Sequence, residues 1–330
     1  MRASAKELLD YYQVRKSFKQ KQLFIEWMNM HAGEHGYTIS GQRYRLGRGR
    51  NLIVGDPAEA EVILTAHYDT PPNALLPIIT IVGNIPVYIV SQIFIYAPII
   101  TILWLLHVVA TAIFADMGRL GDMIPFIWIE VPLLVLVLLI LWSFQMMRGF
   151  ANRKNANDNT SGVVVLLSLL EDLPLPLQSK ICFVFFDDEE KGFGGSKIFK
   201  RRYRKEVKLK PVINFDCVAH GRHLMFITKK AFRDSRKLNE ILTEVTASKA
   251  LVTEAKKYVY PSDQLIFKNS VGVVALNKLP IFGYYLSRLH SCYDRKFNPD
   301  NIEALNQMMV AFIEKAVGDK EESCKKGVYK

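Results

Sequence analysis

The stretch Glu61-Val-Ile-Leu-Thr-Ala-His-Tyr-Asp69 joins a short β-branched apolar run to a polar end. A run of this length and composition is typical of a strand buried on both faces of a sheet. Ile181–Phe186 and Val212–Phe215 repeat the pattern, and residues 162–173 and 195–203 between them are readable as helices. Strands that alternate with helices predict an α/β fold, with a mixed, largely parallel, twisted sheet covered by helices on both faces.

The first residues predict one long helix, because apolar side chains recur near helical spacing between Ala5 and His31. No apolar signal-peptide core follows Arg2, so we expect no cleaved leader. The four cysteines show no Cys-x-x-Cys spacing. Scattered cysteines of this kind suit a reducing compartment and argue against a thiolate zinc site.

Polar side chains follow the apolar runs, at the strand ends where an open α/β sheet places its site. His67 and Asp69 are two residues apart on an extended chain, so their side chains leave the same face. The pair fits a metal-bound histidine oriented by an acid. A simple polar pair at a strand end, without a metal, is an equally good interpretation of these two residues.

Four consecutive carboxylates, Asp187-Asp-Glu-Glu190, follow the apolar run Ile181–Phe186. Adjacent carboxylates repel unless they are solvated or face cations, so a divalent metal is one interpretation. Glu189 and Glu190 cannot both point at one metal from a regular strand. This geometry leaves one of them as a ligand and the other for proton transfer.

The remaining candidate ligands are less conspicuous. Asp158 lies in the polar segment Asn155–Gly162 ahead of an apolar helix, where helix capping is the competing interpretation. Asp216 closes the third run, and His290 lies in a loop after Tyr284–Leu286. The set of two imidazoles and three carboxylates comprises His67, Asp158, Glu190, Asp216 and His290. Such a set suits zinc and, less specifically, cobalt or manganese.

The order of these motifs resembles peptidase family M28, the co-catalytic zinc aminopeptidases and carboxypeptidases. The family's motifs His-x-Asp, Gly-Ala-x-Asp-Asn-x-Ser-Gly and Glu-Glu-x-Gly-Leu-x-Gly-Ser are similar, in this order, to His67-Tyr-Asp69, Asn155-Ala-Asn-Asp-Asn-Thr-Ser-Gly162 and Glu189-Glu-Lys-Gly-Phe-Gly-Gly-Ser196. Asn214–Asp216 and His290–Asp294 are similar to the last two elements. The resemblance covers residues 5–74 and 150–317.

This resemblance implies two Zn²⁺ ions, one bound by His67 and the other by His290. Asp158 would bridge them, and Asp216 and Glu190 would complete the two ligand sets.

The same resemblance implies that Asp69 orients His67 and that Glu189 is the general base. Glu189 would take a proton from the water that bridges the cations and pass it to the leaving amine. The implied function is a zinc-dependent exopeptidase, closer to an aminopeptidase than to a carboxypeptidase, that hydrolyses short peptides.

Two alternatives stay open: a catalytically inactive membrane scaffold of this fold, and a mononuclear zinc glutaminyl cyclase. The presence of all five ligands and the base disfavours the scaffold. Intact His67-x-Asp69 favours two metals over one. Three residues depart from the family pattern without removing a ligand, namely Asn155, Gln264 and Cys292.

A long apolar insert separates Asp69 from Asp158. Residues Leu75–Ala115 contain no charged side chain, and Met123–Met147 contain only Glu130. Both segments exceed the roughly 20 residues that a membrane-spanning helix needs, although buried core helices are the alternative. We therefore predict residues 1–74 and 150–330 as two parts of a peptidase domain, with 75–149 as a transmembrane hairpin.

His67 and Asp158 must meet on one side of the bilayer, which requires an even number of crossings. We expect two, with Pro77–Pro86 as a lead-in and Asp116–Asp122 as the far loop. The basic residues on the near side then predict a bacterial-type inner or plasma membrane, a cytoplasmic catalytic domain, and an active-site mouth close to the lipid bilayer.

The net charge of +11 raises the question of an acidic partner. The densest basic run, Lys197–Lys210, has only two aromatic residues, which is a thin stacking platform for nucleic acid. A solvated face, or a surface on anionic lipid, is the preferred interpretation, and no nucleic-acid partner is expected. Oligomeric state and side-chain specificity are not predicted.

Overall fold

The structure is a computed structural model that describes residues 1–74, 78–116, 149–280 and 283–327, with a few single positions between 133 and 145. The described strands are β1 (Ile39–Tyr44), β2 (Gly49–Val54), β3 (Val62–His67), β4 (Ile78–Val82), β5 (Ile181–Phe186), β6 (Val212–Phe215), β7 (His223–Thr228), β8 (Ala250–Glu254), β9 (Ser270–Leu279) and β10 (Gly283–Leu289). The described helices are α1 (Ala3–Tyr11), α2 (Phe18–Glu34), α3 (Ile85–Asp116), α6 (Thr160–Asp172), α7 (Leu175–Gln178), η2 (Glu189–Lys191), α8 (Gly194–Arg202), α9 (Glu206–Leu209), α10 (Lys230–Asp234), α11 (Arg236–Thr246), η3 (Asp263–Ile266) and α12 (Pro299–Gly327).

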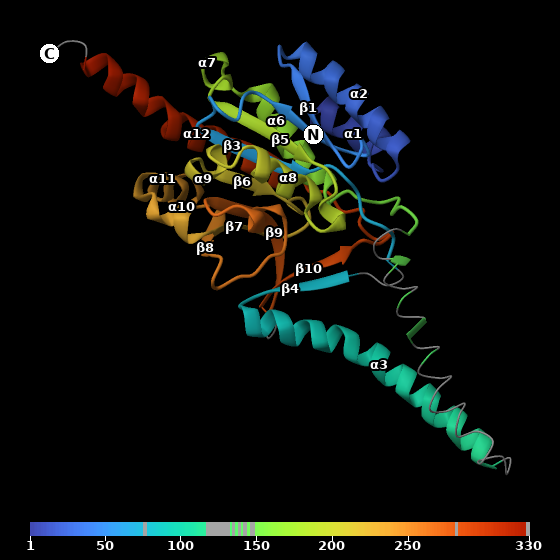
Figure 1. Cartoon of the computed structure of the whole chain (residues 1–330). Helices are drawn as coiled ribbons and strands as arrows, with labels where there is room; N and C mark the ends of the chain where they lie inside the picture. The colour runs from blue at the N-terminus through green and yellow to red at the C-terminus, as the bar shows by residue number, and fades with distance from the viewer. Residues whose placement is uncertain are drawn as a thin grey trace.

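Ten strands of the described chain form one sheet in the order β1-β2-β5-β3-β6-β9-β10-β4, and β7 joins β8 to β9 (Figure 1). The central strands β5, β3, β6 and β9 run parallel. Their outer neighbours β2 and β10 pair antiparallel with β5 and β9, and β1 pairs antiparallel with β2. The predicted mixed α/β sheet is confirmed, but its parallel part is confined to the centre and to the β7–β8 pair.

Helices cover both faces of the sheet, as predicted. The strand alternation explains this: Val62 and Leu64 on β3 belong to the core under α6 and α12, whereas Ile63 between them belongs to the core on the other face. Phe199 of α8 and Val207 of α9 complete that second core. Both cores consist of apolar side chains. The polar side chains of the candidate site lie beyond them, at the ends of the strands.

The predicted single helix at the amino terminus is two helices. The first helix ends at Tyr11, and the second begins after Ser17. The Ser17 hydroxyl accepts a hydrogen bond from the amide of Gln20, while the Gln20 side chain accepts one from the Ser17 amide. This reciprocal pair is a capping box and starts α2. The break matters for the site because it places Arg15 and Lys16 on a connecting segment and Lys21 in the first turn of α2.

The apolar segment after Asp69 also differs from its prediction. Residues of the expected lead-in form β4, which pairs antiparallel with β10 from Tyr284↔Val82 to Leu289↔Ile78. Helix α3 then runs away from the sheet (Figure 1). The apolar run is therefore divided between a strand of the main sheet and a helix. Apolar composition alone did not show which part forms the strand and which part forms the helix.

In the described part of the chain we find no helix with the length and continuous apolarity needed to cross a membrane. The structure thus does not support the transmembrane hairpin. The predicted localisation, an integral protein of a bacterial-type inner or plasma membrane with a cytoplasmic catalytic domain, is corrected by this finding. Apart from a few positions between 133 and 145, the second expected crossing, Met123–Met147, lies outside the described residues, as does most of the loop Asp116–Asp122.

Candidate active site

The candidate residues come from the carboxyl ends of three neighbouring parallel strands. His67 is the last residue of β3, Asp216 follows β6, and Glu189 and Glu190 form η2 shortly after β5. Because β5, β3 and β6 run parallel and adjacent, their carboxyl ends meet at one edge of the sheet. Three segments that are far apart in the sequence thus contribute to one site.

Asp158 lies at the centre of this site, between the two histidines. One of its oxygens is 3.5 Å from His67 Nε2, and the other is 3.2 Å from His290 Nε2. His67 Nε2 is also 3.5 Å from Asp216 Oδ1, and His290 Nε2 is 3.4 Å from Glu190 Oε2. The structure therefore brings the five predicted ligands together as two triads that share one carboxylate.

The backbone before α6 presents Asp158 to both triads. Asp294 accepts hydrogen bonds from the amides of Asn157 and Asp158, each at 3.0 Å. Asn159 is the residue that caps α6, since its side chain accepts a hydrogen bond from the Gly162 amide at 3.0 Å. The capping alternative considered for Asp158 thus applies to its neighbour, and the Asp158 side chain is left for the site.

Gly162 is required at the start of α6 by close packing. A Cβ atom at this position would lie 2.3 Å from the carbonyl oxygen of Phe215, which immediately precedes Asp216. The absence of a side chain lets α6 approach the end of β6, and this approach brings Asp158 close to Asp216.

Asp69 supports both a histidine and the loop with the two glutamates. Its Oδ1 accepts a hydrogen bond from the Glu189 amide at 3.0 Å, and its Oδ2 accepts one from the Glu190 amide at 3.3 Å. His67 Nδ1 lies 3.6 Å from Asp69 Oδ1 and 3.1 Å from the Asp69 carbonyl oxygen. Burial raises the pKa of Asp69, but the hydrogen bond with His67 and the charge of Lys21 outweigh it, so that the pKa falls to about 2.

His290 reaches the site from an irregular strand end. The pairing of β10 with β4 shifts register between Leu286 and Leu289, which is a β-bulge. Arg288 and His290 both have left-handed backbone conformations, with φ of 70° and 53°. Bulges of this kind redirect a side chain at the edge of a sheet, and here the imidazole is turned toward Asp158.

The four consecutive acids divide into two pairs with different surroundings. Asp187 pairs with the buried Lys21. Asp188 is 3.0 Å from Arg45 Nη1 and 2.6 Å from Lys191 Nζ. The two aspartates are thus neutralised by cations of the chain, whereas Glu189 and Glu190 each place a carboxylate oxygen within 4.8 Å of a nitrogen of His67.

The electrostatics of the site favour a positive charge at its centre. Burial lowers the pKa of His67, but the charge of Glu189 and the hydrogen bond with Asp158 outweigh it and raise the pKa well above its usual value. Burial and the charge of Asp158 raise the pKa of Glu190 far above its ordinary value. A buried cluster with these shifts is stabilised by cations.

The donor atoms fit a metal centre by a second criterion. Among the described residues, the carboxylate oxygens Glu190 Oε1 and Asp216 Oδ1 are buried without a hydrogen-bond partner. Buried polar atoms normally have partners, because leaving one unpaired costs about 1–3 kcal/mol. Carboxylate oxygens and imidazole nitrogens are the donors that zinc accepts. The residues present therefore fit zinc.

Sequence reasoning missed three buried ionisable residues at or beside the site. Lys21, Asp263 and Asp294 were assigned no role, although all three side chains are buried. Burial raises the pKa of Asp263 to about 7 and that of Asp294 to about 8. Asp294 lies in the motif that contains His290, which was an available signal. No local pattern distinguishes Lys21 from the exposed lysines around it.

The three departures from the family pattern have ordinary packing roles. Asn155 is buried and donates hydrogen bonds to the carbonyl oxygens of Asn152 and Gln13, at 2.7 and 3.3 Å. Gln264 accepts a hydrogen bond from Asn214 at 3.2 Å and donates one to Tyr260. Cys292 is exposed. None of the three replaces a side chain of the two triads.

A sequence match identifies the family of the chain. Residues 146–313, more than half of the chain, match the sequence model of Peptidase family M28. The chain belongs to peptidase family M28. No curated protein matches this M28 chain. The resemblance seen in the sequence is therefore confirmed at the level of the family, while the inserted transmembrane hairpin is not supported.

Solved structures share the fold of this M28 chain at low sequence identity. The LapA aminopeptidase of Legionella pneumophila has a TM-score of 0.55 at 12% identity, over 95% of this chain and 69% of its own. The glutaminyl cyclase of Porphyromonas gingivalis has 0.57 at 14%, over 95% and 98%. A Zn-dependent exopeptidase of Parabacteroides distasonis has 0.54 at 14%, over 94% and 97%. These likenesses show the fold alone.

Proposed function

We propose that this M28 chain is a zinc-dependent exopeptidase of the aminopeptidase type that hydrolyses short peptides. The observation that carries the proposal is the shared carboxylate: Asp158 directs one oxygen to each of two histidines, and each histidine has a second carboxylate beside it. This arrangement supports two metal ions that share one ligand. In domain terms, residues 1–74 and 150–330 would form the peptidase, with 75–149 inserted between them.

The proposed ligands are His67 and Asp216 for one Zn²⁺, His290 and Glu190 for the other, and Asp158 for both. When bound, the ions would supply Lewis acidity for the scissile carbonyl and lower the pKa of the attacking water. Cobalt or manganese are possible substitutes.

Glu189 is the proposed general base. It lies next to a ligand, its amide is fixed by Asp69, and its carboxylate is within 4.8 Å of a nitrogen of His67. Burial and the charges of Glu190 and Asp263 raise the pKa of Glu189 well above its ordinary value. A carboxylate with a raised pKa is a better proton acceptor, so Glu189 can take a proton from the attacking water and return it to the leaving amine.

Asp69 is a positioning residue in this scheme. By fixing His67 and the amides of Glu189 and Glu190, it holds a ligand and the base in one geometry. Lys16 lies near Glu190, and its pKa is lowered, mainly by burial. A cation at this place would attract a substrate carboxylate.

A mononuclear glutaminyl cyclase is the second candidate, because glutaminyl cyclases are among the proteins that share the fold. Metal content and substrate choice separate the two. We would measure zinc per chain by elemental analysis and test a panel of aminoacyl and peptide substrates beside a peptide with amino-terminal glutamine. Two zinc ions with release of amino-terminal residues support the peptidase, whereas one zinc ion with cyclisation of glutamine and no hydrolysis contradicts it.

A further inference from the structure

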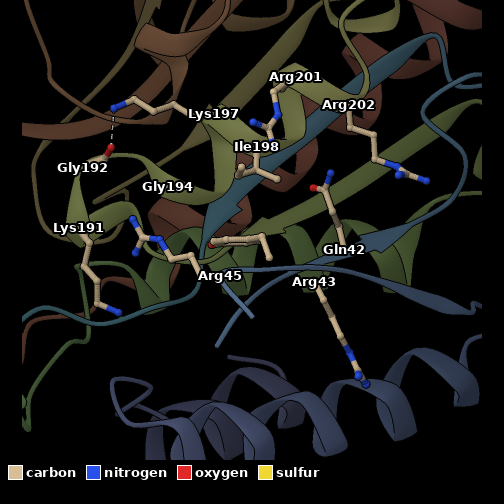
Figure 2. A pocket seen from close by; sticks show the side chains of 11 residues that line it. Gln42, Arg43, Arg45, Lys191, Gly192, Gly194, Lys197, Ile198, Arg201 and Arg202 are labelled. Atoms are coloured by element: carbon tan, nitrogen blue, oxygen red, sulfur yellow. Dashed lines mark hydrogen bonds between the residues drawn. The ribbon is translucent and has the colours of Figure 1, made fainter. Parts of the chain in front are cut away.

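A basic pocket lies on the far side of the loop that carries the two glutamates. Its volume is about 770 Å³, which is within the range of small-molecule and peptide subsites. One wall comes from the β1–β2 hairpin, and the other comes from η2, the loop after it and α8 (Figure 2). The pocket thus joins the edge of the sheet to the catalytic loop.

Six cationic side chains line this pocket, and no acidic side chain does. Arg45 and Lys191 are held by Asp188, and Lys197 donates to the Gly192 carbonyl oxygen at 2.9 Å. The other three lining cations, which make no ion pair with any described carboxylate, are Arg43, Arg201 and Arg202. A concave surface with this much uncompensated charge concentrates anions.

The pocket borders the loop that carries Glu189 and Glu190. Lys191, which lines it, is the residue after Glu190 within the single turn of η2. Neighbouring Cα atoms are about 3.8 Å apart, so the Lys191 end of the pocket lies beside the glutamates along the chain. The only aromatic side chain of the lining is Tyr44, whose hydroxyl donates to the Asp187 carbonyl oxygen. Such a wall offers little to the stacked bases of a nucleic acid.

We propose that this pocket is a subsite for acidic side chains of the peptide substrate. The proposal rests on the proposed peptidase function and names its substrate class. Arg201 and Arg202 of α8 supply the charge that selects carboxylates. Arg45 and Lys191, fixed by Asp188, connect that charge to the catalytic loop.

The test compares two amidated tetrapeptides, Leu-Ala-Glu-Glu and Leu-Ala-Gln-Gln, which differ only in charge. We expect kcat/KM for the acidic peptide to exceed that for the neutral one about tenfold at low ionic strength, and the ratio to fall as salt is added. In the double variant Arg201→Gln, Arg202→Gln, the ratio should fall to about one. The matched control removes two exposed cations at the other end of the sheet, Lys256→Gln and Lys257→Gln, and should keep the wild-type ratio.

Binding is measured separately, so that the subsite and the chemistry are judged independently. In the Glu189→Gln protein, fluorescence anisotropy of labelled peptides should still show tighter binding of the acidic peptide. Equal binding of the two peptides overturns the subsite, whether or not the wild-type protein hydrolyses either one. Failure to hydrolyse both peptides, with the binding preference intact, contradicts the peptidase function alone. Competition by pyrophosphate without any difference between the peptides would show a small-anion site and also overturn the proposal.

Discussion

Asp187 and Asp188 carry the same kind of acidic group as Glu189 and Glu190 but face different partners. The two aspartates face cations that belong to the chain, namely Lys21, Arg45 and Lys191. The two glutamates face histidines and other carboxylates. The difference shows that a run of acids carries two functions: the part that is neutralised by side chains fixes the loop, and the part that is left over is available for metal and proton chemistry.

The largest effect should come from the second pair. Glu189→Gln removes the proton acceptor without removing a proposed ligand, so we expect kcat to fall by a factor of about 10² to 10⁴. Zinc content should stay equal to that of the wild type. Elemental analysis beside a peptide hydrolysis assay checks both, and loss of zinc in this variant would show that Glu189 is a ligand.

The shared carboxylate should affect metal more broadly than a carboxylate of one triad. Asp158→Ala is expected to lower zinc content at both sites, because each oxygen of Asp158 faces one histidine. Asp216→Ala is the matched control and should lower content at one site only. Zinc per chain after dialysis measures this, and equal losses in the two variants would argue against a bridging role.

The aspartate pair should affect stability before chemistry. Lys21→Met leaves Asp187 as a buried charge without its cation, and breaking such a pair typically costs about 3–5 kcal/mol. The free energy of unfolding, from urea denaturation, should fall by this order. The double variant Lys21→Met, Asp187→Asn should recover part of the loss. A single variant as stable as the wild type would contradict the neutralising role.

The smallest effect should come from a carboxylate far from both pairs. Burial raises the pKa of Glu171, but hydrogen bonds with His31, Ser4 and Arg2 outweigh it and lower the pKa from 4.5 to about 2. Because the folded pKa is the lower one, this stabilisation is complete above about pH 4.5 and is lost as the pH falls toward 2.

Glu171→Gln should therefore destabilise the protein at pH 7 by about 1 kcal/mol or less, since the pair is partly exposed. The difference from the wild type should shrink between pH 4.5 and 2. Urea denaturation at several pH values measures this, and a difference that is independent of pH would refute the role of the carboxylate charge.

The sequence predicted the centre of the fold well and its periphery poorly. The apolar runs of β3, β5 and β6 are buried on both faces, so composition alone identified them as strands. The hairpin of β1 and β2 has a half-exposed first strand without such a run. The apolar residues of β4 carried no sign of their partner, β10, which lies about 200 residues later.

The candidate site residues were grouped by a different route from the fold. No spacing argument brings Asp158 to His67, 91 positions earlier in the chain; only the order of motifs shared with a family did so. Lys21 escaped both routes. A lysine becomes a buried counter-ion through the tertiary position of its helix, and this position is set by packing around Phe24 and Trp27 rather than by its own neighbours.

The pairing of β4 with β10 makes the insertion mechanically relevant to the imidazole of His290. Ile78 pairs with Leu289, and the Ala74 amide donates to the His290 carbonyl oxygen at 2.6 Å. The chain that leaves toward α3 thus passes along the same strand that ends at His290. A displacement of that segment would reach His290 through these hydrogen bonds, whereas His67 ends β3, which pairs with neither β4 nor β10.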